Sequence, residues 1–141
     1  MRKFLYLISP NKIKPSFYLD LDEVLSSNKV MFFQLRLKDY SASKILNIGK
    51  KIRKITKKYK VPFHTDGVQA VGRLNINFLK SGIDMMTISS HKIGGPVGAG
   101  ALIVASKKQI LQPILFGGDQ EDSLRSGTEP LLAIAGFGQA A

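Results

Sequence analysis

Short apolar runs alternate along the chain with segments in which apolar residues recur at helical spacing. Isoleucines recur in this way through the lysine-rich segment 44–60, which predicts an amphipathic helix capped by Ser41 or Ser43. Further helices are predicted at residues 75–81, closed by Gly82, and from residue 129 to residue 141. The predicted strands are residues 4–8, 31–37, 61–66, 84–89 and 101–105. This alternation of strands and helices indicates the α/β class.

Positive charge is concentrated in the first 60 residues of the chain. They contain 15 Lys and Arg against 4 Asp and Glu, whereas residues 61–141 contain 6 of each, which accounts for the formal net charge of +11. Because apolar residues follow helical spacing through residues 44–60, we interpret the lysines as the solvated face of a helix. We therefore expect no nucleic-acid partner. No apolar run approaches the roughly 18 residues of a membrane span, so we expect no membrane partner either.

The opening residues MRKFLYLISP superficially resemble a secretion signal. Their apolar run covers only Phe4 to Ile8, which is shorter than the roughly 7–15 residues of a signal core, and no small-residue cleavage site follows. The chain contains no cysteine, so disulfides and thiolate metal sites are excluded within it, and no metal site is predicted. We expect a cytoplasmic protein.

Candidate chemistry is concentrated between residues 64 and 98. Asp66 ends a predicted strand, Gln69 follows three places later, and a Ser-Ser-His-Lys run spans residues 89–92. Pyridoxal phosphate needs a carboxylate at its ring nitrogen, a lysine amine for its aldehyde, and donors for its phenolic oxygen and phosphate. Taken singly, these residues are typical of turns, surfaces and tight glycine loops. Their joint order and spacing favour a cofactor site.

Three segments in order resemble the class V aminotransferases, which are pyridoxal-phosphate enzymes of fold type I. The segments are HTDGVQAVG at residues 64–72, SSHKIGGPVGAGAL at 89–102 and GGDQEDSLRSGTEPLLAIAGFGQA at 117–140. The third segment narrows the resemblance to the cysteine desulfurases. The resemblance implies that residues 61–141 form part of the large domain of such an enzyme, preceded by a βαβ-like piece.

The resemblance also implies roles for individual residues. It implies that Lys92 bonds covalently to pyridoxal 5'-phosphate and moves the α-proton, that Asp66 pairs with the pyridinium nitrogen, and that Gln69 bonds the phenolic oxygen. Thr128 would reach the phosphate of a neighbouring subunit, which implies a homodimer, and Arg125 would have a structural or subunit-contact role. The remaining phosphate contacts implied are Ser89, His91 and the backbone of Ser90.

The family reaction converts L-cysteine to L-alanine and passes the sulfur to an enzyme thiolate as a persulfide. L-cysteine and a sulfur-acceptor or iron–sulfur scaffold protein are therefore the implied partners. This chain has no such cysteine, lacks the family's upstream cofactor loop, and has Asp119 where the family usually has glycine. We expect a desulfurase fragment that is inactive alone. A truncated or recombined, non-catalytic product that pairs with an intact desulfurase is the alternative.

Residues 1–60 resemble a different family. FLYLISP and MFFQLRLKDYSASKILNIGKKIRKITKKYKVPF are similar to the start of thiamine-phosphate synthase, a (β/α)8 barrel. This implies that Gln34, Arg36 and Lys38 bind pyrophosphate from one face of a strand, although Leu37 replaces the family's usual Glu, and a solvated edge strand is the alternative. The predicted domains are 1–60 and 61–141, with a crossover within 44–63. A thiamine-phosphate synthase fragment is the second functional hypothesis.

Overall fold

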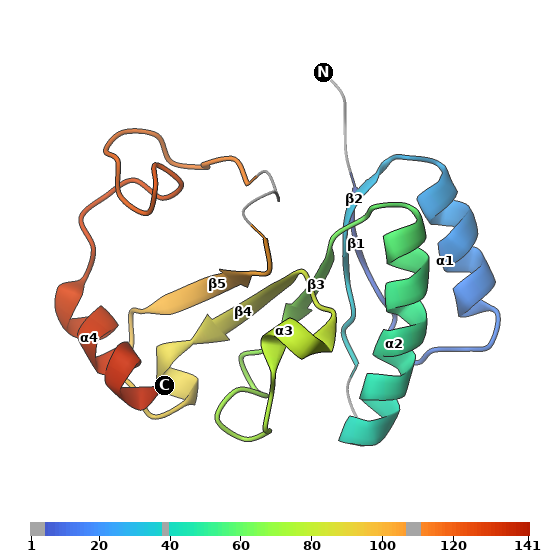
Figure 1. Ribbon diagram of the computed structural model, residues 1–141, viewed down its shortest axis with the longest axis horizontal. Coiled ribbons are helices and arrows are strands. Elements are labelled where there is room, and N and C mark those ends of the chain that lie inside the picture. The colour runs from blue at the N-terminus through green and yellow to red at the C-terminus, as the bar shows by residue number, and fades with distance from the viewer. Residues whose placement is uncertain (1–4, 38–39, 107–110) are drawn as a thin grey trace.

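The structure, a computed structural model, describes residues 5–37, 40–106 and 111–141. Within these ranges the chain forms one five-stranded sheet, with its strands side by side in sequence order (Figure 1). The first four strands run parallel and β5 is antiparallel to β4. The predicted α/β class is confirmed. The strands are β1 (Leu5–Ile8), β2 (Val30–Gln34), β3 (Phe63–Asp66), β4 (Met85–Ser89) and β5 (Gly100–Val104), and the helices are α1 (Phe17–Ser26), α2 (Ala42–Lys58), α3 (Phe78–Ser81), α4 (Leu131–Ala140) and the short 3-10 helix η1 (Ser90–Lys92).

The helices differ more from the sequence prediction than the strands do. Helix α1 was missed, although Leu21 and Leu25 lie one turn apart and are 2% and 0% exposed. Helix α3 is shorter than predicted because Asn77 begins it, accepting a hydrogen bond from the Lys80 N–H at 3.0 Å. Gly82 ends α3 in the left-handed region at φ 74°, as predicted.

In the described part of the chain, a hydrophobic core lies between the sheet and the helices α1 and α2, which pack side by side against one face (Figure 1). Phe33 on β2 is fully buried, and its ring centroid is 6.1 Å from that of Phe63 on β3. Leu25 and Ile52 contribute to the same core from α1 and α2. Residues on both sides of position 60 therefore share one sheet and one core. The proposed boundary at residue 60 and the thiamine-phosphate synthase resemblance stay predictions.

Helix α2 has the amphipathic pattern that its sequence predicts. Ile48 and Ile52 are buried against the sheet, whereas Lys50, Lys54 and Lys57 are exposed. The lysines therefore form its solvated face. Over the described residues, no helix is both long and apolar enough to cross a bilayer.

Candidate cofactor site

The carboxyl ends of β3 and β4 bring the central candidate residues to one edge of the sheet. Asp66 is the last residue of β3 and pairs in register with Thr87 on β4. Two residues later β4 ends at Ser89, and η1 continues the chain to Lys92. Carboxyl ends of neighbouring parallel strands are where α/β sheets bind ligands. Asp66, at the end of β3, and Lys92, in η1 just after β4, therefore lie at the same edge of the sheet.

A tight turn follows Asp66 and fixes the direction of the chain. The Asp66 Oδ1 accepts a hydrogen bond from the Val68 N–H at 3.1 Å, and Gly67 donates to the Thr87 carbonyl at 2.9 Å. A Cβ on Gly67 would lie 2.8 Å from the Met86 side chain, so this close approach requires glycine. Gln69 lies within the turn with its side chain exposed. One anchored turn thus presents both Asp66 and Gln69.

The backbone of Ser90 anchors η1 beside this turn. Ser90 donates to the Ala99 carbonyl at 3.1 Å, and its own carbonyl accepts from the Ile93 and Gly95 N–H groups, each at 3.1 Å. The side chain is fully buried, and within the described residues its hydroxyl has no hydrogen-bond partner. The structure therefore gives Ser90 a packing position, and its assignment to the cofactor phosphate stays a prediction.

The neighbouring side chains are available to a ligand. Ser89 Oγ and His91 Nδ1 form a hydrogen bond of 2.9 Å, which orients the imidazole. His91 and Lys92 are both exposed. A lysine amine, a carboxylate on the adjacent strand, and hydroxyl and imidazole donors are the groups that pyridoxal phosphate requires. The donor set therefore fits this cofactor.

Thr128 lies apart from these strand ends, in the exposed segment between β5 and α4. Hydrogen bonds within the segment hold it: Arg125 donates to the Gly127 carbonyl at 3.0 Å, and the Gly127 N–H donates to Gln120 Oε1 at 3.1 Å. Asp119 accepts a hydrogen bond from the Ser123 hydroxyl at 3.1 Å, so its carboxylate serves the loop itself. The contribution of Thr128 to a second subunit stays a prediction.

Helix α4 brings the chain back to the edge of the sheet where β3 and β4 end. A Cβ on Gly136 would lie 2.5 Å from the Pro96 ring, and a Cβ on Gly95 would lie 3.2 Å from that of Ala140. These contacts seat α4 on the loop that follows Lys92, as Figure 1 shows at the C-terminal end of the chain. The position of η1 therefore depends on α4 as well as on β4.

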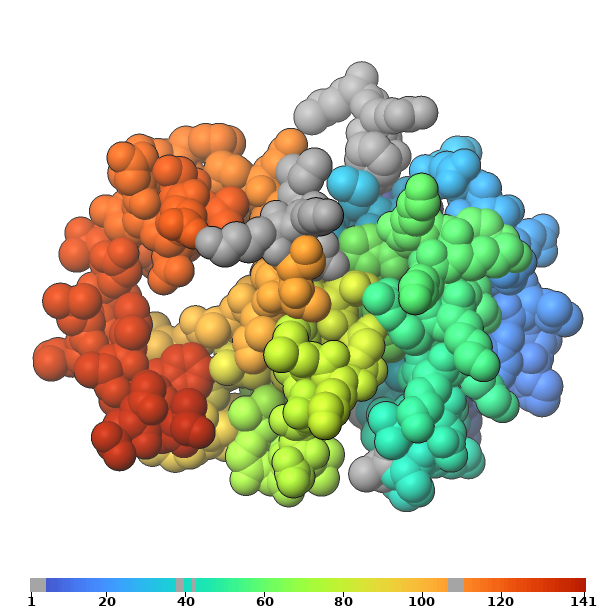
Figure 2. All heavy atoms as spheres, viewed as in Figure 1, coloured from blue at the N-terminus to red at the C-terminus, as the bar shows by residue number. Residues whose placement is uncertain are grey.

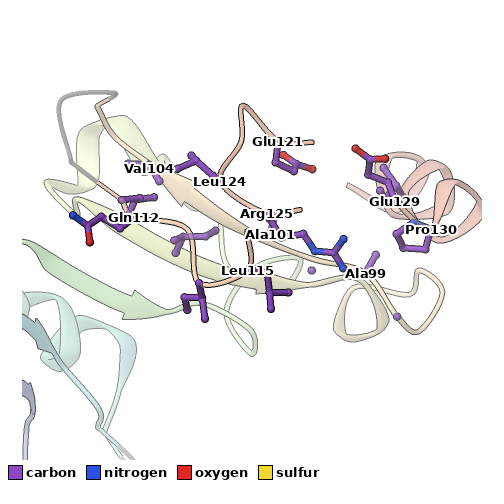
Figure 3. A pocket seen from close by; sticks show the side chains of 16 residues that line it. Ala99, Ala101, Val104, Gln112, Leu115, Glu121, Leu124, Arg125, Glu129 and Pro130 are labelled. Carbon is purple, nitrogen blue, oxygen red and sulfur yellow. The ribbon is translucent and has the colours of Figure 1, made fainter. Parts of the chain in front are cut away.

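A cavity of about 850 Å³ lies between β5 and the segment 111–134. Figure 2 shows it as a hollow between the orange C-terminal segment and the yellow strands. Its lining is mainly apolar, and Figure 3 shows Arg125, Glu121 and Glu129 among the side chains around it. None of Asp66, Gln69 and Lys92 lines this cavity. The candidate cofactor groups lie at the carboxyl ends of β3 and β4 instead.

The three residues predicted to bind pyrophosphate do not share a strand. Strand β2 ends at Gln34, whose Oε1 accepts a hydrogen bond from the Tyr6 hydroxyl at 3.3 Å. Arg36 follows in an irregular segment, exposed, with its N–H donating to Ser9 Oγ at 2.9 Å. Lys38 lies outside the described residues. The expected strand through residue 37 is therefore wrong, and pyrophosphate binding stays a prediction.

Sequence reasoning gave no role to His64, which the structure places beside the candidate site. Its ring contacts Tyr6 on β1 and Thr87 on β4 through both nitrogens. The alternation of a strand could have identified His64, because it lies two residues before Asp66 and so shares its face. Tyr6 and Thr87 carried no such signal, since only the sheet order brings them together.

Comparison with known proteins identifies the family of this chain. The aminotransferase class-V family model matches residues 43–141. The mitochondrial cysteine desulfurase of Saccharomyces cerevisiae is 48% identical over 93 residues, which cover 65% of this chain and 19% of that protein. The cysteine desulfurase IscS of Dictyoglomus turgidum is 44% identical over 89 residues, covering 63% of this chain and 22% of that protein. The chain thus spans about a fifth of the length of these relatives.

Solved structures extend the likeness to the whole described fold. The NifS-like protein from Rickettsia africae has a TM-score of 0.72 and 35% identity, and the match covers 96% of this chain and 43% of that one. The apo cysteine desulfurase of Thermococcus onnurineus shares the fold at 14% identity, with a TM-score of 0.70. Class V aminotransferases and their cysteine desulfurase relatives depend on pyridoxal phosphate. On the family match and the geometry of its strand ends, this chain belongs to the aminotransferase class-V family.

Proposed function

We propose that this chain forms the lysine-bearing part of the pyridoxal-phosphate site of a cysteine desulfurase. The observation that carries the proposal is the placement of Asp66 and Lys92 at the carboxyl ends of two neighbouring parallel strands. The similarity to cysteine desulfurases of yeast and bacteria supports the choice of reaction within the family. It favours L-cysteine as the substrate and a homodimer as the assembly.

Each candidate residue has a defined task in this proposal. Lys92 would hold the cofactor through its amine, the group that reacts with the cofactor aldehyde. The Asp66 carboxylate holds the proton on the ring nitrogen, and Gln69 donates to the phenolic oxygen. Ser89 and His91, already oriented by their mutual hydrogen bond, bind the phosphate. When bound, the cofactor supplies an electron sink that weakens the bonds at the α-carbon of an amino acid.

The sulfur-transfer step needs a thiol from outside these 141 residues. Persulfide formation requires a thiolate nucleophile, and the sequence contains no cysteine. We therefore infer that this segment binds the cofactor and the amino-acid substrate, and that the acceptor thiol belongs to another segment or another protein. Supply of sulfur for iron–sulfur clusters or thiolated cofactors is the corresponding proposed role, in the cytoplasm.

Borohydride trapping tests the cofactor site directly. The chain is incubated with pyridoxal phosphate, reduced with borohydride, digested, and mapped by mass spectrometry. We expect the reduced adduct to form preferentially on Lys92 and to disappear in K92A. The matched control is K80A, because Lys80 is an exposed lysine on α3, away from the strand ends. Equal labelling of Lys92 and the other exposed lysines would refute the proposal.

A further inference from the structure

A row of polar side chains crosses four strands on the sheet face opposite α1 and α2. Tyr6 on β1 forms a 2.7 Å hydrogen bond with His64 Nδ1 on β3, and the other ring nitrogen forms a 2.8 Å hydrogen bond with Thr87 Oγ1 on β4. Gln34 on β2 accepts from the Tyr6 hydroxyl at 3.3 Å and pairs in register with His64. His64 is therefore fixed from both sides within the sheet.

The hydrogen-bond donors and acceptors of this row are satisfied by a neutral imidazole. If Tyr6 donates to Gln34, its oxygen accepts from the Nδ1–H of His64, and the bare Nε2 accepts from Thr87. If Tyr6 instead donates to Nδ1, the Nε2–H donates to Thr87. Either neutral tautomer uses both ring nitrogens. The partners thus hold the ring orientation without requiring a charge on it.

Asp66 lies on the same face as this row. It follows His64 by two residues on β3, and side chains two apart on a strand share a face. Its register partner on β4 is Thr87, which holds the His64 ring. The Asp66 charge also raises the pKa values of both Tyr6 and His64, although burial is the larger influence on each. The carboxylate is therefore electrostatically coupled to the row.

Burial disfavours the charged form of the imidazole. It lowers the pKa of His64 below the ordinary value of 6.5, and the Asp66 carboxylate offsets only part of this shift. Among the described residues, the titratable groups that act on the ring are Tyr6 from β1 and Asp66 from β3. Strands β2 and β4 contribute the uncharged Gln34 and Thr87. The ring therefore adds less positive charge beside Asp66 than an ordinary histidine would.

We propose that His64, held by Tyr6 and Thr87, is a positioning residue that keeps the Asp66 carboxylate available to the ring nitrogen of pyridoxal phosphate. This inference rests on the proposed function above. A protonated His64 would be a cation on the same strand as Asp66 and would compete with the cofactor ring nitrogen for its carboxylate. The neutral ring, held by its two hydrogen bonds, only supports the end of β3. Through Tyr6 the segment before residue 60 thereby contributes to the cofactor site without contacting the cofactor.

Variants of Thr87 separate the effect of its hydroxyl, which holds His64, from the effect of its side-chain volume. T87V keeps the shape of the side chain but removes the hydroxyl that holds His64, T87S restores the hydroxyl, and T65V makes the same change on the opposite face of β3. Absorbance titration with pyridoxal phosphate measures the affinity of each. We expect T87V to bind about tenfold more weakly, the lower end of the cost of losing a supporting hydrogen bond at metal sites. T87S and T65V should bind as the unsubstituted chain does.

A second readout needs no cofactor. NMR titration of the imidazole signals in the cofactor-free chain should give His64 a pKa below 6.5, identified by its loss in H64Q, and D66N should lower it further. In the presence of cofactor, affinity should fall on acidification more steeply for the unsubstituted chain than for H64Q.

The outcomes distinguish the two proposals. Absence of any Lys92 adduct in the unsubstituted chain would overturn the proposed function and the role of His64 with it. A normal Lys92 adduct with equal affinities for T87V and T87S, or a His64 pKa that D66N leaves unchanged, would overturn the role of His64 alone.

Discussion

Arg53 on α2 and Asp84, the residue just before β4, form a two-point ion pair. The guanidinium nitrogens lie 2.7 and 2.8 Å from the two carboxylate oxygens. The Asp84 Oδ2 also accepts a hydrogen bond from the Phe63 N–H at 2.8 Å. One carboxylate thereby ties α2, β3 and β4 together where the two strands begin; β3 ends at Asp66, and η1 with Lys92 follows β4.

Substitution of Asp84 by asparagine tests how much this junction contributes to stability. D84N keeps the volume but removes the charge, and hydrogen bonds to charged groups contribute about 1.5–3 kcal/mol each. Because the Arg53 and Asp84 side chains are only 27% and 18% exposed, solvent screens the pair weakly. We expect a loss of about 2 kcal/mol in the free energy of unfolding, measured in urea. The control is D22N, which disturbs the exposed pair with Lys58; equal shifts in both variants would contradict this view.

The junction also shows which parts of the fold the sequence can predict. Strand β4 begins with the apolar residues Met85 and Met86, and β3 lies in a short segment that ends at the polar Asp66, so local pattern suffices to locate both. The pairing of Arg53 with Asp84 joins residues 31 positions apart and depends on the strand order, which no local pattern contains. Helix α1 was missed although Ser16, a residue type typical of N-caps, precedes it and Leu21 and Leu25 have helical spacing.

The residues of the candidate site also fall into those that local motifs predict and those that depend on the fold. Asp66, Gln69 and Lys92 were predictable because their chemistry lies within two short motifs that follow adjacent strands. His64 was not assigned, because its role depends on Tyr6, 58 residues earlier in the chain. The buried position of Ser90 was also unforeseen, because it results from the packing of Gly95 against it.

Two phenylalanines with opposite exposure test the core. Phe33 is 0% exposed between β2 and the helices, whereas Phe116 is 82% exposed. Truncation of a buried phenylalanine leaves a cavity and costs about 3–5 kcal/mol, so F33A should unfold at much lower urea concentration or fail to fold. F116A should change stability by less than about 0.5 kcal/mol. Similar midpoints for the two variants would refute the described core.

Gly95 and Ser90 form a tight contact that a double substitution can test. A Cβ on Gly95 would lie too close to the buried Ser90 Oγ, so G95A forces the neighbouring atoms apart. Overpacking of this kind costs about 1–3 kcal/mol. S90G removes the hydroxyl that clashes, so the G95A/S90G double variant should recover part of the loss. Thermal unfolding of the single and double variants measures this coupling, and strict additivity would argue against the contact.

The acid sensitivity of folding depends on His64. Its pKa is lowered in the folded state by burial, so the unfolded chain binds this proton more readily. The contribution of His64 to stability is therefore fully present above the unfolded value of 6.5 and is lost as the pH falls through 6.5 toward the lower folded value. Urea unfolding between pH 8 and pH 5 should show this loss, and H64Q should reduce the slope. An unchanged slope in H64Q would show that His64 titrates alike in both states.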